Sequence, residues 1–207
     1  MIVSKIKMGG GWKRAIIQCV ASVVRTFRGE VSTATLVKRG LVVGKNFSRQ
    51  GGCRIDTSYC HLITVGDDVT LAPNVVLLAH DNSPKCFSGL ARLGRIDIGN
   101  HVFIGAGTII LPDVKIGNNV IIGAGSVVTR DIPSNSLAVG NPAKVIKPLD
   151  EFIEKTVKGA KQSSIFENKL YSPLNLTSER RQEMKEKLKN GAGYFKTVTY
   201  EEFNSLD

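Results

Sequence analysis

Aliphatic residues recur at every sixth position through the middle of the chain. From Ile98 the sequence divides into the units IGNHVF, IGAGTI, ILPDVK, IGNNVI, IGAGSV and VTRDIP. The first position of each unit is Ile or Val, and the fifth is aliphatic or a small hydroxyl residue. Three more units, VGDDVT, LAPNVV and LLAHDN, begin at Val65, Leu71 and Leu77. The repeat therefore contains nine clear units.

A period of six excludes an α-helix and favours β-strands. In a helix, six residues advance the chain by about 600°, so the leading aliphatics would point in three directions and form no buried stripe. In strands, positions one and five of a unit face the same side. Gly and Asn between the units supply the backbone freedom that tight corners need. The pattern predicts short strands joined by corners, with about 18 residues closing a triangular coil and the stacked coils burying an aliphatic ladder.

The repeat also sets the predicted domain organisation. We expect the β-helix over residues 41–147, interrupted by a non-repeating extruded loop at 81–95. Residues 1–40 are expected to form a basic helical segment, and residues 148–207 a helical extension. Both suit the role of caps, because the open ends of a solenoid expose strand edges that invite aggregation.

Three helices are predicted in these flanking segments. Residues 11–28 have an amphipathic pattern, with basic residues outside an aliphatic cluster. Residues 148–162 begin with Pro148 and continue with acidic residues, which the helix dipole favours. Residues 178–190 form the third helix, with Ser178 as the candidate N-cap.

Composition narrows the class of protein. The chain has 207 residues, 42% of them hydrophobic, and a formal charge of +10, which fits a globular domain with an appendage rather than a disordered chain. No apolar run is long enough to span a membrane, and no secretory signal is recognised, so a cytoplasmic protein is expected. Its four cysteines lack a paired spacing, which predicts free thiols and no disulfide framework.

Positive charge is concentrated at the start of the chain. Residues 1–40 contain eight Lys or Arg and a single acidic residue, Glu30, whereas residues 148–207 are neutral. This excess of positive charge predicts attraction to an anionic membrane surface or to a polyanionic substrate. The alternative is that these basic residues form the solvent-exposed face of a helix and bind no partner. Aromatic residues are few and no binding motif is present, so nucleic acid is not expected as a partner.

The hexapeptide units resemble those of the hexapeptide-repeat acyltransferases over roughly residues 41–147. The segment TRDIPSNSLAVGNPAKVI (Thr129–Ile146) resembles the closing segment of acetyltransferases that modify galactosides, maltose, streptogramins and bacterial polysaccharides. This resemblance implies a mainly β fold, a left-handed parallel β-helix, and homotrimers with active sites between subunits. It also implies direct transfer of acetyl from acetyl-CoA to a hydroxyl of a sugar or polysaccharide precursor, within a ternary complex.

The candidate base is a histidine at the point where the repeat breaks. Acyl transfer to a hydroxyl needs a general base, and His is the side chain best tuned to neutral pH. His80 ends the unit LLAHDN, and the resemblance gives it the role of deprotonating the acceptor. Asp81 follows, and either perturbs the imidazole, orients the acceptor or caps the loop turn. His61 and His101 are expected to be structural or solvent-facing, and Cys60 beside His61 is not expected to form a catalytic pair, because neighbours in a strand face opposite sides.

The acceptor cannot be named from the sequence. In several related sugar acetyltransferases an Asn one to two coils earlier holds the acceptor, but the corresponding stretch here, residues 47–53, reads FSRQGGC. Arg49 and Gln50 are the candidate substitutes.

A donor site is predicted around two alanines. Ala106 and Ala124 are 18 residues apart, so they stack at one corner and leave backbone groups open to a pantetheine arm. Small residues that merely fit a tight corner explain them equally well, and the resemblance assigns them to coenzyme A. Cations in the closing segment are expected to meet the phosphates through ionic hydrogen bonds. The other predicted contacts are Thr129, Arg130, Asn141, Pro142, Lys144 and Lys147.

Two other function classes stay open. An amino-sugar N-acetyltransferase would use the same fold and donor, and a non-catalytic β-helix scaffold or binding module would need neither the His nor the cations. A β-helical carbonic anhydrase is disfavoured because the three His residues lack metal-ligand spacing, so no metal site is predicted.

Overall fold

The computed structural model describes residues 30–173 and 175–196. The helix predicted over residues 11–28 lies outside this part of the chain. The chain divides into two compact units, Met1–Leu149 and Asp150–Asp207, which are considered separately below.

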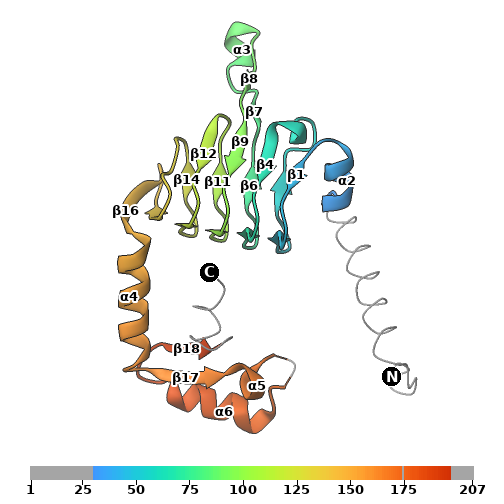
Figure 1. Cartoon of the computed structure of the whole chain (residues 1–207). Helices are drawn as coiled ribbons and strands as arrows, with labels where there is room; N and C mark the ends of the chain where they lie inside the picture. Colours follow the sequence, from blue (N-terminus) through green and yellow to red (C-terminus); the bar gives the residue numbers. More distant parts are fainter. Residues whose placement is uncertain (1–29, 174, 197–207) are drawn as a thin grey trace, which may run out of the picture. The chain divides into compact units, whose positions relative to one another are not determined.

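The first unit is a stack of coils built on three sheets (Figure 1). The first sheet contains β1 (Val42–Val43), β4 (Ile63–Val65), β9 (Ile96–Ile98) and β12 (Val114–Ile116). The second contains β2 (Ser48–Arg49), β5 (Thr70–Leu71), β10 (Val102–Ile104), β13 (Val120–Ile122), β15 (Ser136–Val139) and β16 (Lys144–Pro148). The third contains β3 (Arg54–Ile55), β6 (Val76–Leu77), β11 (Ile109–Ile110) and β14 (Val127–Val128).

Strands within each sheet are parallel, and the chain passes through the sheets in turn. Val102 pairs with Val120 and Ile110 with Val128, which confirms the predicted coil of 18 residues in this block. The exception is β16, which turns back and pairs antiparallel with β15 at the end of the stack. The parallel coils therefore agree with the β-helix that the six-residue period predicts.

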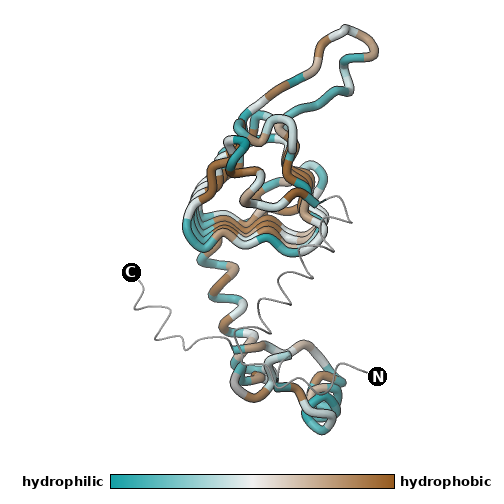
Figure 2. Tube along the Cα trace, turned by 90° about the vertical axis from the view of Figure 1, so that its right-hand side faces the viewer, coloured by the Kyte–Doolittle hydropathy of each residue, from teal (hydrophilic) through white to brown (hydrophobic). Residues whose placement is uncertain are grey.

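The predicted ladder is the core. All six leading residues from Ile98 onward are at most 3% exposed, and the fifth positions are buried as well. Two of those fifth positions, Thr108 and Ser126, are hydroxyl residues, and both donate to the carbonyl of Gly123, at 3.2 and 2.6 Å. These bonds explain how the interior holds two polar side chains, since a buried hydroxyl without a partner is costly. Figure 2 shows the successive coils superposed.

The corners between the first and second sheets share one backbone conformation. A residue at each has φ between 54° and 57°, the left-handed region that Asn and Asp tolerate better than other side chains. These residues are Asn46, Asp68, His101, Asn119 and Asn135. His101 is exposed at its corner, in agreement with the expectation that it is structural or solvent-facing.

Helix α2 (Thr33–Lys38) lies at the first coil. Ser32 caps it by accepting a hydrogen bond from the backbone N–H of Thr35 at 3.1 Å. Leu36 projects from this helix and is fully buried in the core of the β-helix. The helix thus adds an apolar side chain to the core at the first coil of the solenoid.

The predicted excursion is a projecting hairpin (Figure 1). Strands β7 (His80–Asp81) and β8 (Arg92–Leu93) pair antiparallel, and α3 (Lys85–Ser88) lies between them. Phe87 near its tip is 94% exposed.

The second unit contains both helices and strands. Its elements are α4 (Leu149–Ala160), β17 (Ser164–Glu167), α5 (Asn168–Tyr171), α6 (Ser178–Lys187) and β18 (Gly193–Lys196). The helical extension expected here is corrected in part, because β17 and β18 form a parallel pair. The predicted cap Ser178 is the first residue inside α6; the preceding Thr177 has an extended backbone and accepts from the N–H of Arg180 at 3.3 Å. Within the described ranges, no helix has the length and apolarity needed to cross a lipid bilayer.

Candidate active site

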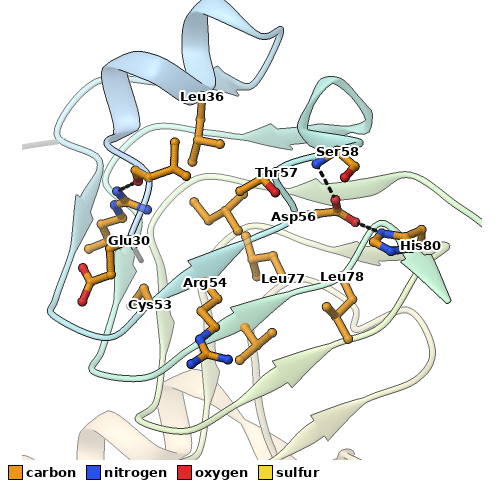
Figure 3. A pocket seen from close by; sticks show the side chains of 14 residues that line it. Glu30, Leu36, Cys53, Arg54, Asp56, Thr57, Ser58, Leu77, Leu78 and His80 are labelled. Carbon is orange, nitrogen blue, oxygen red and sulfur yellow. Dashed lines mark hydrogen bonds and ion pairs between the residues drawn. The ribbon is translucent and has the colours of Figure 1, made fainter. Parts of the chain in front are cut away.

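His80 is paired with a carboxylate that lies one coil earlier. Its Nδ1 contacts Oδ2 of Asp56, which directly follows β3 (Figure 3). The side chain of Asp56 is 1% exposed, and that of His80 is 28% exposed. A buried carboxylate thus holds one ring nitrogen of an imidazole whose other side reaches solvent.

The backbone fixes the carboxylate of Asp56 in this position. Oδ1 accepts hydrogen bonds from the N–H groups of Ser58 and Tyr59, each at 3.0 Å. Oδ2 accepts a third from the N–H of Ala79, at 3.1 Å, in addition to its contact with the imidazole. Both oxygens are therefore occupied, and the side chain cannot rotate without losing several bonds.

Burial and hydrogen bonding act on Asp56 in opposite directions. Burial alone raises the pKa of a carboxyl group, because it disfavours the charged form. The hydrogen bonds from His80 and from the N–H groups of Tyr59 and Ser58 together outweigh burial and lower the pKa of Asp56. The residue is therefore an ionised hydrogen-bond acceptor at neutral pH.

This arrangement selects the tautomer of His80. Because Asp56 accepts, Nδ1 is the protonated nitrogen, and Nε2 carries a lone pair that can take up a proton. The ring of Tyr59 lies against the imidazole, with centroids 5.1 Å apart and an interplanar angle of 54°. The imidazole is thereby contacted by both a carboxylate and an aromatic ring.

A cavity of about 350 Å³ opens beside the pair. Its lining comes from the segment before α2, from β3 and the corner after it, and from the end of β6 (Figure 3). Arg49, a predicted acceptor contact, lines it and donates to the carbonyl of Val31, whereas Gln50 does not line it. A space of this size suits a small polar ligand next to the imidazole.

Asp81, the other predicted catalytic residue, makes contacts within the hairpin. Its Oδ1 accepts from the N–H of Ser83 at 2.8 Å, and its Oδ2 accepts from the hydroxyl of Ser83 at 3.0 Å. These bonds lower the pKa of Asp81, with the backbone N–H of Ser83 contributing most. The described contacts are those of a turn-capping residue, and its catalytic role stays a prediction.

The predicted donor residues lie at two corners of the coil. Ala106 and Ala124 are exposed and stack where the second sheet passes to the third, since the N–H of Gly125 donates to the carbonyl of Ala106 at 2.8 Å. Thr129 and Arg130 follow β14 at the corner where the third sheet passes to the first, which is also the corner of His80. They lie two coils from His80, about 10 Å at the usual strand spacing.

The remaining donor residues lie in the closing turn. Asn141 and Pro142 form the turn between β15 and β16, joined by a cis peptide bond, and both are exposed. The turn is anchored to β14, since Ala143 donates to the carbonyl of Val127 at 2.8 Å. Lys144 begins β16 and is exposed, and Lys147 is half-buried in the same strand. A single subunit therefore does not gather all the predicted donor residues around His80.

Sequence reasoning missed Asp56. The corner after β3 is lengthened by the short 3-10 helix η1 (Cys60–Leu62), so this coil has 22 residues instead of 18, as the pairing of Ile55 with Leu77 shows. His80 lies two residues beyond the position that matches Asp56 in the next coil, so it follows Asp56 by 24 residues. One feature of the sequence could have indicated it: Asp56 directly follows β3, a strand of the same sheet as β6, which precedes His80.

In η1 itself, Cys60 is buried and donates from Sγ to the carbonyl of Leu36, while His61 is exposed. Among the described residues, no group of His, Cys, Asp and Glu is arranged to hold a metal ion.

Comparison with known proteins agrees with the hexapeptide-repeat fold. A family model described as bacterial transferase hexapeptide (six repeats) matches residues 95–130. Protein CapG of Staphylococcus aureus is 43% identical over 128 residues, covering 58% of this chain and 74% of CapG. Galactoside O-acetyltransferase of Escherichia coli K12 is 40% identical over 114 residues, covering 53% of this chain and 54% of that protein.

A solved structure aligns over the same region. The maltose O-acetyltransferase of Clostridium difficile 630 is 45% identical, with a TM-score of 0.48, and the alignment covers 53% of this chain and 59% of that one. The chain therefore spans only about half the length of several relatives that it matches.

Proposed function

Because the chain belongs to the hexapeptide-repeat family of bacterial transferases, whose aligned relatives include acetyltransferases, we propose that it transfers acetyl from acetyl-CoA to a sugar hydroxyl. The observation that carries this proposal is the Asp56–His80 pair at the edge of an open cavity. A buried carboxylate, an imidazole and a free Nε2 together make a general base.

His80 acts on the acceptor. Nε2 removes the proton of the acceptor hydroxyl while the hydroxyl oxygen attacks the thioester carbonyl carbon. Asp56 stabilises the imidazolium that forms. The tetrahedral intermediate then collapses, the carbon–sulfur bond breaks, and His80 returns the proton to the sulfur of coenzyme A. The products are an acetyl ester and the free thiol, without an acyl-enzyme. Backbone N–H groups beside the cavity stabilise the developing oxyanion.

The donor lies along the stacked corners of a left-handed β-helix. Ala106 and Ala124 leave room for the pantetheine arm, and Thr129 lies near the thioester. The phosphates meet cations and turn residues of the last coil, where ionic hydrogen bonds are strong. This group comprises Arg130, Asn141, Pro142, Lys144 and Lys147.

We further propose a homotrimer with active sites between subunits. The alanine corner and the histidine corner are different corners of one coil, so a neighbouring copy supplies the missing part of each site. The trimer proposal is supported by the separation of the predicted donor residues Ala106 and Ala124 from His80 at two different corners.

Thiol release from acetyl-CoA tests the proposed function. Wild type and His80→Ala are assayed with a chromogenic disulfide across sugars, nucleotide sugars and oligosaccharides. We expect acceptor-dependent release that falls by a factor on the order of 10²–10⁴ in His80→Ala, the contribution typical of a general base. His101→Asn is the matched control, because Asn occupies the equivalent left-handed corner at three other coils.

Equal release by wild type and His80→Ala would remove His80 as the base. Absence of both thiol release and coenzyme A binding, measured by calorimetry, would favour the scaffold hypothesis instead.

A further inference from the structure

A second hollow adjoins the cavity beside His80. It has a volume of about 750 Å³ and is lined by residues of the corners between the second and third sheets, including Gln50 and Asn74. The two hollows share Glu30, Arg54 and Val76 in their linings. Together the two hollows form a groove beside strands β3 and β6.

Arg54 lies where the two hollows meet. It is the first residue of β3, and its side chain is exposed because the next residue, Ile55, fills the core. Asp56 follows two residues later, about 7 Å along an extended chain. Arg54 and His80 both line the first cavity.

The other charged groups of this groove are engaged. Glu30 accepts from the N–H of Gly52 at 2.8 Å, Arg49 donates to a backbone carbonyl, and Asp56 is held by His80. Among the residues that the structure describes, Arg54 has no hydrogen-bond or ion-pair partner.

We propose that Arg54 determines specificity, and that the acceptor is an acidic glycan with a carboxylate or phosphate beside the hydroxyl that receives acetyl. The inference rests on the proposed acetyl transfer and names its substrate class. A planar guanidinium binds either anion through two parallel hydrogen bonds. The second hollow, of about 750 Å³, leaves room for a further part of the glycan beside Arg54.

Paired oligosaccharides test this proposal. One arm compares oligogalacturonates with their methyl esters, and a second compares phosphorylated oligosaccharides with their dephosphorylated forms. Calorimetry measures binding to the wild-type protein, and thiol release measures turnover. We expect the acidic member to be preferred at least tenfold in one arm, which also identifies the anion, and the preference to shrink as salt is added.

Substitution of Arg54 gives the decisive comparison. Arg54→Gln is expected to lose most of the preference, with KM for the acidic acceptor rising about tenfold and KM for acetyl-CoA unchanged; Arg54→Lys is expected to retain part of it. Lys115→Gln is the matched control, since it removes one exposed positive charge from the first sheet, outside the groove.

Failure of this proposal is distinguishable from failure of acetyl transfer. Without any acceptor, slow His80-dependent hydrolysis of acetyl-CoA to acetate and free thiol reports catalysis by His80 independently of Arg54. If that hydrolysis persists while neither arm shows a preference, or while Arg54→Gln keeps the preference, the assignment of Arg54 is overturned. Binding of anionic phosphatidylserine vesicles, with no preference in either arm, would instead assign the basic residues to a membrane surface.

Discussion

The carboxylate of Asp56 orients the imidazole of His80. It is buried, its two oxygens accept three backbone N–H groups, and the remaining acceptor position faces Nδ1. An Asn in its place would direct its NH₂ group at either a backbone N–H or the imidazole. The NH₂ group of the Asn would therefore face an N–H donor at a position where the Asp oxygen accepts a hydrogen bond, and that hydrogen bond would be lost.

The first prediction concerns Asp56→Asn. We expect kcat to fall by a factor on the order of 10² or more, because the productive tautomer and the stabilised imidazolium are both lost. KM for acetyl-CoA is expected to stay unchanged, since the predicted donor residues lie elsewhere. Steady-state kinetics measure both values.

Asp81→Asn provides the matched comparison for that variant. An Asn at this position can still accept from the N–H of Ser83, so turn capping predicts a rate close to wild type. A loss equal to that of Asp56→Asn would show that Asp81 acts on the chemistry, and would contradict the assignment of the orienting role to Asp56 alone.

The second prediction concerns stability at low pH. The pKa of Asp56 is lower in the folded protein than its ordinary value near 4, so the folded state favours the ionised form. Its stabilising contribution is therefore complete above about pH 5 and is lost as the pH falls from there through the folded pKa. Urea unfolding at pH 7 and at successively lower pH should show a smaller loss in Asp56→Asn than in wild type; equal losses would contradict this linkage.

At the scale of elements, the six-residue period determines most of the first unit. The leading aliphatics from Ile98 to Val128 are all buried, so the periodicity predicted the strands, their inward faces and the 18-residue coil. It failed where the corner length changes. The lengthened corner that carries η1 displaced Asp56 from the repeat, and the hydrogen bonds of Asp81 depend on a hairpin that no periodicity describes.

The third prediction compares neighbouring residues of β12. Ile116 is 1% exposed in the ladder, whereas Lys115 faces outward. Ile116→Ala should lower the free energy of unfolding by about 2–5 kcal/mol, through lost apolar burial and a residual cavity. Lys115→Ala should change it by less than about 0.5 kcal/mol. Urea unfolding followed by circular dichroism distinguishes them, and similar losses in both variants would contradict the assigned inward and outward faces.

At the scale of the whole molecule, the two corners of a coil divide the predicted site. His80 lies at one corner and the pair Ala106 and Ala124 at another, so one chain does not bring them together. The sequence predicted less of the C-terminal unit, because the parallel pairing of β17 with β18 joins segments separated by two helices and follows no repeat.

The fourth prediction is complementation between inactive subunits. Ala124→Glu places a bulky anion on the proposed donor path at an exposed corner, and His80→Ala removes the base. If sites form between subunits of a homotrimer, unfolding the two variants together and refolding them should restore about a quarter of wild-type activity through random mixing. Thiol release measures the recovery. No recovery in mixed oligomers verified by mass spectrometry would place each site within one chain.

The acetylated product itself gives the most direct test of the role proposed for His80. The wild-type protein, His80→Ala and the control His101→Asn are incubated with acetyl-CoA and an acceptor that supports thiol release, and the product is examined by NMR. We predict an O-acetyl ester on a sugar hydroxyl with wild type and His101→Asn, and almost none with His80→Ala. An N-acetyl product, or equal ester formation by His80→Ala, would contradict the claim that His80, held by Asp56, deprotonates a sugar hydroxyl for acetyl transfer.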